Sequence, residues 1–228
     1  MFHGYLPTIL GGALLTLELA VLSLVFALVA GLAGAAAKLS RSMLLRTAAT
    51  VYTTVVRGVP DLVMMLLVFY GGQMVVNHVT EHFDLGYFDL NPMVAGVLTI
   101  GFIFGGYFAE TFRGAFLAVP AGQLEAGAAY GMTRWQVFAR ILFPQMLRHA
   151  LPGLGNNWLV LLKSTAIVSM IGLSDMTWLA DQAGRTTREP FLFYLLVCVL
   201  YLAMTTVSSW LLARLEKRYS AGVRAAEL

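Results

Sequence analysis

The stretch PFLFYLLVCVLYLAMTTVSSWLLA, residues 190–213, runs for 24 residues without a charged side chain. A helix needs about 20 mainly apolar residues to cross the hydrocarbon core of a bilayer. The run is too long for a buried strand, and it lacks the apolar–polar alternation of an outer-membrane barrel strand. It therefore predicts a membrane-spanning helix.

Four further apolar runs precede this one along the chain. They cover residues 9–37, 62–80, 90–109 and 151–174, and the only charges inside them are Glu18 and Lys163. The sequence thus predicts an all-α polytopic membrane bundle with five transmembrane helices. We expect residues 1–228 to form one transmembrane domain.

The composition excludes several other classes of protein. Hydrophobic residues make up 59% of the 228 residues and charged residues 12%, and the mean hydropathy is +0.77. Soluble domains usually carry about 25% charged residues, so a disordered chain, a nucleic-acid binder and an ordinary soluble enzyme are excluded. Cys198 is the single cysteine, which rules out an internal disulfide and argues against a cysteine-based metal site.

Lys and Arg are distributed unevenly between the two sides that five spans define. Twelve of the 15 lie in the segments after spans one and three and in the C-terminal tail. The positive-inside rule assigns this side to the cytoplasm, so we expect the N-terminus outside and the C-terminus inside. The twelve are Lys38, Arg41, Arg46, Arg57, Arg113, Arg134, Arg140, Arg148, Arg214, Lys217, Arg218 and Arg224, and the opposite side has Arg185 and Arg188.

The longest segment on the cationic side, about residues 113–149, is predicted to form a helix-turn-helix at the membrane surface. Good helix formers follow Gly122, and Gly131 and Pro144 are expected to act as breakers. By periodicity alone, a generic amphipathic interfacial loop fits equally well.

A sequence motif distinguishes these two interpretations. Glu125-Ala126-Gly127, then Gly131, then Ile141-Leu142-Phe143-Pro144 resembles the EAA loop of membrane permeases in ATP-binding-cassette (ABC) importers, EAA-x3-G-x9-I-x-LP. The spacing agrees throughout, although Gly127 replaces an alanine and Phe143 a leucine. In that family the loop forms a short coupling helix that docks in a groove of the ATPase subunit.

The resemblance implies roles for the residues of this loop. Ala126 and Gly131 would leave room for a close approach of the ATPase. Glu125 would offer a carboxylate to a basic groove or to a helix N-terminus. Pro144 would end the loop and start the return to the membrane.

The resemblance extends over nearly the whole chain, and further motifs resemble those of the polar amino-acid permeases. A still narrower likeness, to the Q-type membrane subunits of histidine/lysine/arginine/ornithine importers, implies basic amino acids as substrates. Another polar amino acid, such as glutamine or glutamate, is the alternative. The polar amino-acid signatures are Arg57-Gly58-Val59-Pro60, Ala109-Glu110 with Arg113-Gly114, Pro120-Ala121-Gly122-Gln123 and Lys163-Ser164-Thr165, and the narrower likeness rests on the runs 52–63 and 150–158.

The family resemblance also implies an assembly in the bacterial inner membrane. This chain would form half of a pore with a second, similar but distinct permease subunit. Two ATPase subunits would bind ATP and Mg²⁺, and a periplasmic binding protein would deliver the amino acid. The chain itself has no G-x-x-x-x-G-K-[ST] phosphate loop, so we expect no catalytic activity and no cofactor in it.

Three acids lie within or beside the predicted spans, and charges at such positions are functional candidates. We expect Asp61 at the cytoplasmic start of span two, Glu18 one or two turns into span one and Glu110 near the cytoplasmic end of span three. Each could meet a cationic substrate, and Asp61 is the best candidate for specificity. Structural pairing is the alternative, above all between Glu110 and Arg113 at i,i+3.

Three other features allow two interpretations. His78-Val79-Thr80-Glu81-His82 matches H-x-x-E-H, so a membrane metalloprotease that uses His78, Glu81 and His82 is a remote alternative, although short motifs match by chance. Gly101 and Gly105 form a G-x-x-x-G pair that could pack closely against another helix, but 22 glycines also make a chance match plausible. Lys163 is predicted to pair with one of the acids, or to reach toward an interface.

Overall fold

The computed structural model describes residues 4–84 and 86–219, and within them every regular element is helical. Five of the helical segments are long and apolar enough to cross a membrane, which confirms the predicted fold class. Arg224, one of the cations assigned to the tail, lies outside the described residues. The elements are α1 (Leu6–Leu39), α2 (Met43–Gly58), α3 (Asp61–His82), α4 (Pro92–Leu117), α5 (Ala121–Ala129), α6 (Arg134–Val137), a π-turn (Phe138–Leu142), α7 (Phe143–Ser164), a 3-10 segment (Thr165–Ile171), α8 (Met176–Thr187) and α9 (Pro190–Tyr219).

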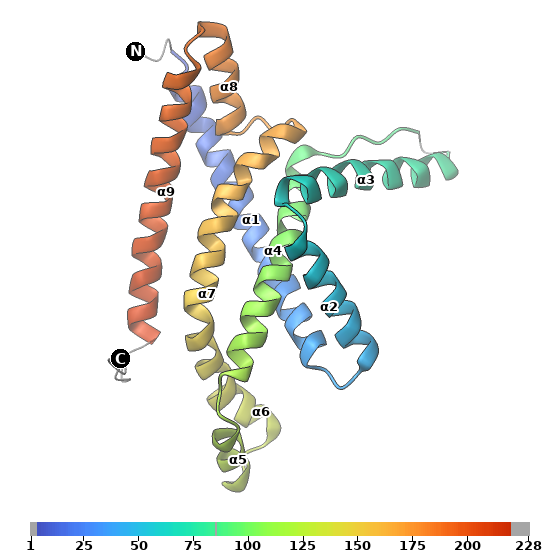
Figure 1. Cartoon of the computed structure of the whole chain (residues 1–228), viewed down its shortest axis with the longest axis vertical. Helices are drawn as coiled ribbons and strands as arrows, with labels where there is room; N and C mark the ends of the chain where they lie inside the picture. Colours follow the sequence, from blue (N-terminus) through green and yellow to red (C-terminus); the bar gives the residue numbers. More distant parts are fainter. Residues whose placement is uncertain (1–3, 85, 220–228) are drawn as a thin grey trace.

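The core of the bundle is the long contact between α1 and α4 (Figure 1). A Cβ on Gly31 would lie only 2.5 Å from the Cβ of Phe108. On the opposite helix, a Cβ on Gly105 would lie 2.9 Å from the Cβ of Ala30, and Gly101 lies against the ring of Phe26. The Gly101/Gly105 pair is therefore a real close-packing face, because any larger side chain there would push the two helices apart.

One end of the bundle is closed by α8, a helix that the sequence analysis did not anticipate (Figure 1). The helix is short and its composition is mixed, so it gives no membrane-span signal. Its buried face, which includes Met176 and Ala180, packs with Ile9 of α1 and Phe193 of α9 in a separate apolar cluster. Asp175 starts the helix, and its carboxylate accepts a hydrogen bond from the Trp178 amide at 2.9 Å.

The segment between the first two spans contains a further helix, for which the sequence analysis gave no prediction. It forms α2, which rises beside α1 and α4, and α3 then leaves the bundle sideways as an arm (Figure 1). Only Met64 and Met65 of α3 are buried. The arm therefore presents most of its apolar surface to its surroundings.

The prediction that Pro144 breaks the helical path is wrong, whereas its place at the start of the next long helix agrees with the prediction that the loop ends there. The chain stays helical from Arg134 to Ile171, and Pro144 lies in the first turn of α7. A π-turn precedes it, in which the Phe143 amide donates to the Phe138 carbonyl, five residues back. Proline is tolerated at this position because amides of a first helical turn need no partner within the helix, and the π-turn absorbs the irregularity.

Candidate coupling site and translocation path

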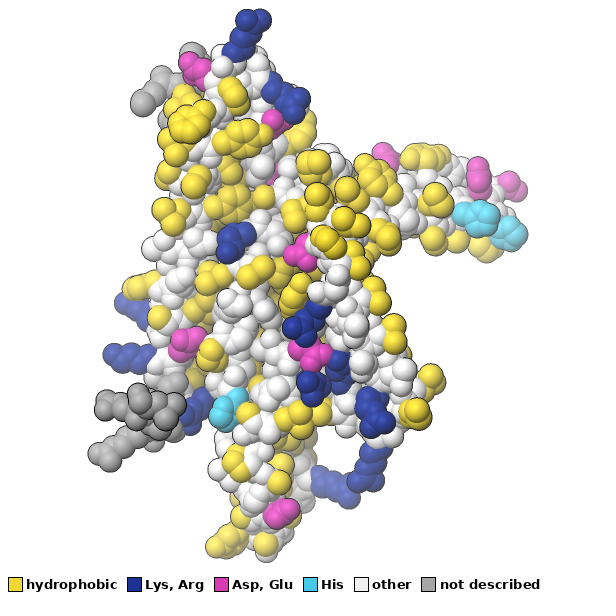
Figure 2. Space-filling model, in the orientation of Figure 1, with side chains coloured by type: hydrophobic (Ala, Val, Ile, Leu, Met, Phe, Trp, Pro, Cys, Tyr) yellow, Lys and Arg dark blue, Asp and Glu magenta, His cyan; other side chains and the backbone are white. Residues whose placement is uncertain are grey.

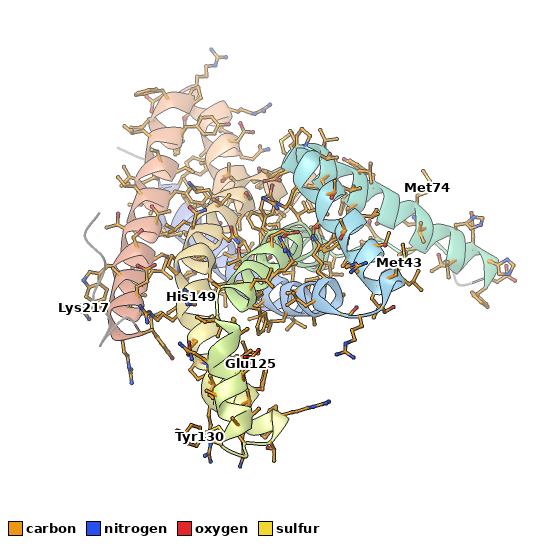
Figure 3. The ribbon with its side chains drawn as sticks, turned by 60° about the horizontal axis from the view of Figure 1, so that its bottom comes forward. Met43, Met74, Glu125, Tyr130, His149 and Lys217 are labelled. Carbon is orange, nitrogen blue, oxygen red and sulfur yellow. The ribbon has the colours of Figure 1, made fainter. Side chains whose placement is uncertain are left out.

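A hairpin of α5 and α6 projects beyond the ends of α4 and α7 (Figures 1 and 3). Gly131 makes the turn possible, since its φ of 80° is strained for any residue with a Cβ. Thr133 then starts α6 with a capping box: its hydroxyl accepts from the Gln136 amide, and the Gln136 side chain accepts from the Thr133 amide. The predicted segment thus contains a helix-turn-helix, although α4 and α7 extend into both of its sides; its place at the membrane surface stays a prediction.

The hairpin is held closed at Gly127. A Cβ at this residue would lie 2.5 Å from Cδ1 of Ile141 and 3.3 Å from Cγ2 of Val137. The Gly127 carbonyl also accepts a hydrogen bond from the Met132 amide at 3.1 Å. The glycine that replaces the motif's second alanine therefore lets α5 pack directly on Ile141, so these two motif residues build the hairpin.

The tip of the hairpin exposes polar and aromatic groups. Glu125 and Ala126 are exposed, and the carboxylate of Glu125 forms no hydrogen bond or ion pair with another described residue. Tyr130 is 90% exposed and Trp135 72% exposed, and Figure 3 shows Glu125 and Tyr130 on the projecting hairpin. Large exposed aromatic side chains of this kind are typical of protein contact surfaces.

A second group of functional candidates lies where α2 passes into α3. The guanidinium of Arg57 is 5.7 Å from the centre of the Tyr107 ring, and the Tyr107 hydroxyl lies near enough to Asp61 to interact with its carboxylate. Asp61 was expected at the cytoplasmic start of the span, but α2 occupies that level, so Asp61 begins α3 part-way along the bundle (Figure 1). Sequence reasoning missed Tyr107, because an aromatic residue in an apolar helix normally indicates core packing.

Glu110 is a structural residue in this conformation. Its carboxylate accepts hydrogen bonds from Lys38 of α1, from Thr53 of α2 at 3.1 Å and from Arg113 at 2.9 Å. The alternative of an i,i+3 pair with Arg113 is therefore confirmed, and Lys38 and Thr53 extend it. Glu110 ties three helices together, and both of its carboxylate oxygens accept hydrogen bonds.

The two charges inside the predicted spans both lie on the protein's surface. Glu18 and Lys163 are exposed, and neither forms an ion pair with any residue from 4–84 or 86–219. The predicted pairing of Lys163 with an acid is therefore wrong within the described chain. Because α1 begins at Leu6, Glu18 also lies about three turns into the helix rather than one or two.

The H-x-x-E-H motif does not form a metal centre. His78, Glu81 and His82 lie toward the end of α3, in the part of the arm that projects from the bundle. Over the described residues, no three His, Cys, Asp or Glu side chains converge as a metal site would require. This geometry gives the protease alternative no support.

Two amide side chains on α3 were not recognised from the sequence. Gln73 donates to the Phe88 carbonyl at 2.5 Å and accepts from the Leu90 amide at 2.9 Å, and Asn77 accepts from the Phe88 amide at 3.1 Å. They hold the segment 86–90 along the arm. Their spacing of four residues places both on one face of the helix, which is the only sequence signal that could have found them.

Comparison with known proteins identifies the family to which this geometry belongs. Residues 23–221 match the model of the family "Binding-protein-dependent transport system inner membrane component". The chain belongs to this family. It is a multi-pass inner-membrane permease of the ABC importer type, a class that works together with ATPase subunits.

Individual relatives agree with this assignment. The chain is 56% identical to the histidine/lysine/arginine/ornithine transport system permease protein HisQ of Escherichia coli, over 100% of both chains. It is 39% identical to the arginine ABC transporter permease protein ArtQ of Haemophilus influenzae, over 96% of this chain and 97% of that one. The permease is a polar amino-acid type, and its relatives are transport components rather than catalysts.

Solved structures support the fold. An amino acid ABC transporter crystallised with histidines has a chain that is 33% identical, with a TM-score of 0.80 over 94% of this chain and 95% of that one. The MetNI methionine ABC transporter in an inward-facing conformation gives a TM-score of 0.74 at 16% identity, over 96% and 99% of the two chains. The second likeness establishes the fold alone.

Proposed function

We propose that this permease serves an importer of basic amino acids, with histidine, lysine, arginine and ornithine as substrates. The observation that carries the proposal is the 56% identity with HisQ over the full length of both chains. The similarity to ArtQ favours the same class of substrate. A permease for another polar amino acid, such as glutamine or glutamate, is the alternative.

The proposal includes an orientation in the membrane. The α8 end of the bundle carries Arg185 and Arg188 and would face the periplasm. The opposite end carries the α5–α6 hairpin and most of the Lys and Arg residues, as the face in Figure 2 illustrates. This agrees with the positive-inside rule, with the N-terminus outside and the C-terminus in the cytoplasm.

The α5–α6 hairpin is the proposed coupling site for the ATPase. The connections of the hairpin to the bundle support this proposal in addition to its motif. Helix α5 follows α4 after three residues, and α6 continues into α7. A displacement of the hairpin would therefore be transmitted to two spans. ATP-driven closure of the ATPase dimer would in this way switch the pore between inward-open and outward-open states.

A second permease subunit would complete the pore, and a periplasmic binding protein would deliver the substrate. The α3 arm is the proposed contact with the second subunit, because it leaves its own bundle with only two residues buried. The surface of the arm includes Met74, which is 73% exposed. Figure 3 shows Met74 on the projecting part of the arm.

Asp61 is the proposed anionic group of the substrate path. A cationic side chain in a low-dielectric pore needs a compensating charge, because an unpaired charge there is costly. Glu110 is less suitable since Lys38, Arg113 and Thr53 already occupy it. Glu18 remains a second candidate, because its carboxylate is exposed and unpaired among the described residues.

Uptake into proteoliposomes tests the substrate class. The complete importer, with its binding protein and internal ATP, should take up arginine and histidine and not glutamine or glutamate. Asp61→Asn should reduce arginine uptake more than tenfold while the ATPase rate falls by less than threefold. Preferred uptake of glutamine or glutamate would refute the substrate class, and unchanged uptake in the variant would refute only the role of Asp61.

Tyr130→Ala tests the coupling site. This side chain is 90% exposed, so its loss should leave the fold intact, whereas Arg at Gly131 would also strain the backbone. A hot-spot contact contributes about 2 kcal/mol or more, and association with the ATPase should weaken about thirtyfold. Tyr87→Ala, at a tyrosine that is 77% exposed near α3, is the matched control. Equal ATPase binding by both variants would place the coupling site elsewhere.

Cysteine crosslinking tests the arm. With Cys198 replaced by Ser, Met74→Cys should crosslink to the second membrane subunit. Met43→Cys is the control, because Met43 is 74% exposed but lies at the start of α2. Crosslinking from Met43 and not from Met74 would exclude α3 as the subunit contact.

A further inference from the structure

A long apolar groove separates the second half of α9 from the rest of the bundle. The cavity has a volume of about 660 Å³ and opens laterally between α1, α7 and α9. Only Phe193 and Val197 of α9 are buried, and both lie in its first half. From Ala203 to Leu212 the helix lines this groove along about 14 Å of its axis, and it meets α7 where Leu212 lies against Gly155.

The chemistry of the walls indicates what fills this space. Ser208 supplies the one polar side chain, and the remaining walls are aliphatic or aromatic, with Trp158 of α7 and Phe108 of α4 at the base. A void of this size in a packed protein forfeits many dispersion contacts unless an apolar molecule occupies it. Apolar walls do not hold water, because water needs polar partners.

A second protein helix is a poor match for the groove. Helices pack closely in membranes through small residues, and the α1–α4 contact of this chain does so with Gly31, Gly101 and Gly105. The groove instead presents long side chains, including Leu17, Leu24 and Leu211. Such side chains adapt to a flexible hydrocarbon chain.

Positive charge lies at one end of the groove. Arg214 follows Leu211 by three residues, and its guanidinium lies 3.5 Å from the centre of the Trp210 ring. Arg218 follows Leu211 by seven residues and therefore lies on the same helical face, and Glu216, four residues after Leu212, lies at the other edge of the groove. Trp side chains are enriched at membrane–water interfaces, so we expect both guanidinium groups near headgroup depth.

We propose that this groove binds one anionic phospholipid, with an acyl chain between α1, α7 and α9 and the phosphate at Arg214 and Arg218. The apolar groove selects the hydrocarbon chain, and the two guanidinium groups select a headgroup with net negative charge. The lipid would fill the space that α9 leaves open and would fix the position of α9 against α7.

Photo-crosslinking tests the site in the assembled importer. The probe is phosphatidylglycerol with a diazirine in its acyl chain, in nanodiscs of phosphatidylcholine, and mass spectrometry locates the labelled residues. Labelling should concentrate on the groove residues of α1, α7 and α9. Ser208→Phe fills the groove and should reduce this labelling at least fivefold, whereas Ser209→Phe, at the neighbouring exposed residue outside the groove, should leave it unchanged.

A second experiment tests the contact between the lipid headgroup and the two arginines. Arg214→Gln with Arg218→Gln should abolish the preference for phosphatidylglycerol over phosphatidylcholine, while labelling by a diazirine phosphatidylcholine persists. Equal labelling of the Ser208→Phe and Ser209→Phe proteins would mean that only unspecific surrounding lipid is present, and would overturn the proposal. A crosslink from Ser208→Cys to another membrane subunit would overturn it as well, because a protein helix would then occupy the groove.

Discussion

Helices α3 and α4 have nearly the same hydropathy, but α3 is mostly exposed and α4 is mostly buried. The most apolar window of each has a mean hydropathy of 1.6 in α3 and 1.7 in α4, yet 11% of that window is buried in α3 and 61% in α4. The glycines account for much of the difference. Four of the five glycines of α4 would bring a Cβ into close contact with other segments, whereas Gly71 and Gly72 of α3 have open space around them. Hydropathy thus identifies a helix that can cross the membrane. Small residues in contact with a neighbouring helix identify one that is packed inside the bundle.

The largest effect should come from the ion-pair network of α4. Glu110→Ala leaves Lys38, whose side chain is only 9% exposed, without its carboxylate partner. Removing one partner of a buried pair costs about 3 kcal/mol or more. Denaturant unfolding in detergent micelles should show this loss.

The double variant Glu110→Leu with Lys38→Met sharpens this test. It removes both charges, so it should recover most of the stability lost in the single variant. If the double variant is as unstable as Glu110→Ala, the network contributes through shape rather than charge.

An intermediate effect should come from the glycines that distinguish the two helices. A Cβ on Gly105 would already lie 2.8 Å from the Tyr52 hydroxyl oxygen, so Gly105→Leu should destabilise the fold by about 2 kcal/mol through overpacking. Gly71→Leu on α3 has open space around it and should leave the unfolding transition unchanged. Equal destabilisation by both would show that the arm is packed within its own chain, contrary to the comparison.

The smallest effect should be local to the arm. Asn77→Leu removes the acceptor of the Phe88 amide, a bond that contributes about 1 kcal/mol. Hydrogen exchange at Phe88 should accelerate about fivefold, while exchange in α4 stays unchanged. His78→Leu, at the next exposed residue, is the control. Faster exchange throughout α4 would show that arm and bundle unfold together.

The sequence alone determined the number of spans and the place of the α5–α6 hairpin. Apolar runs of about 20 residues permit few other structures, because an unpaired backbone amide in lipid is costly. The hairpin was found through Gly131 as a breaker and through the fixed spacing of the EAA motif. Such local constraints can be read from the order of residues.

Tertiary structure decided the rest. Whether Gly101 and Gly105 meet a partner depends on α1, some 70 residues away in sequence, and the same holds for Lys38 and Glu110. Asp61 lies at mid-bundle because α2 forms a helix of its own rather than a loop. Pro144 does not interrupt the helical path from α6 to α7, because the π-turn before it accommodates the proline. Each of these outcomes depends either on contacts between segments that are distant in sequence or on a local change of helix geometry. Neither produces a periodic pattern of residues that could be recognised in the sequence.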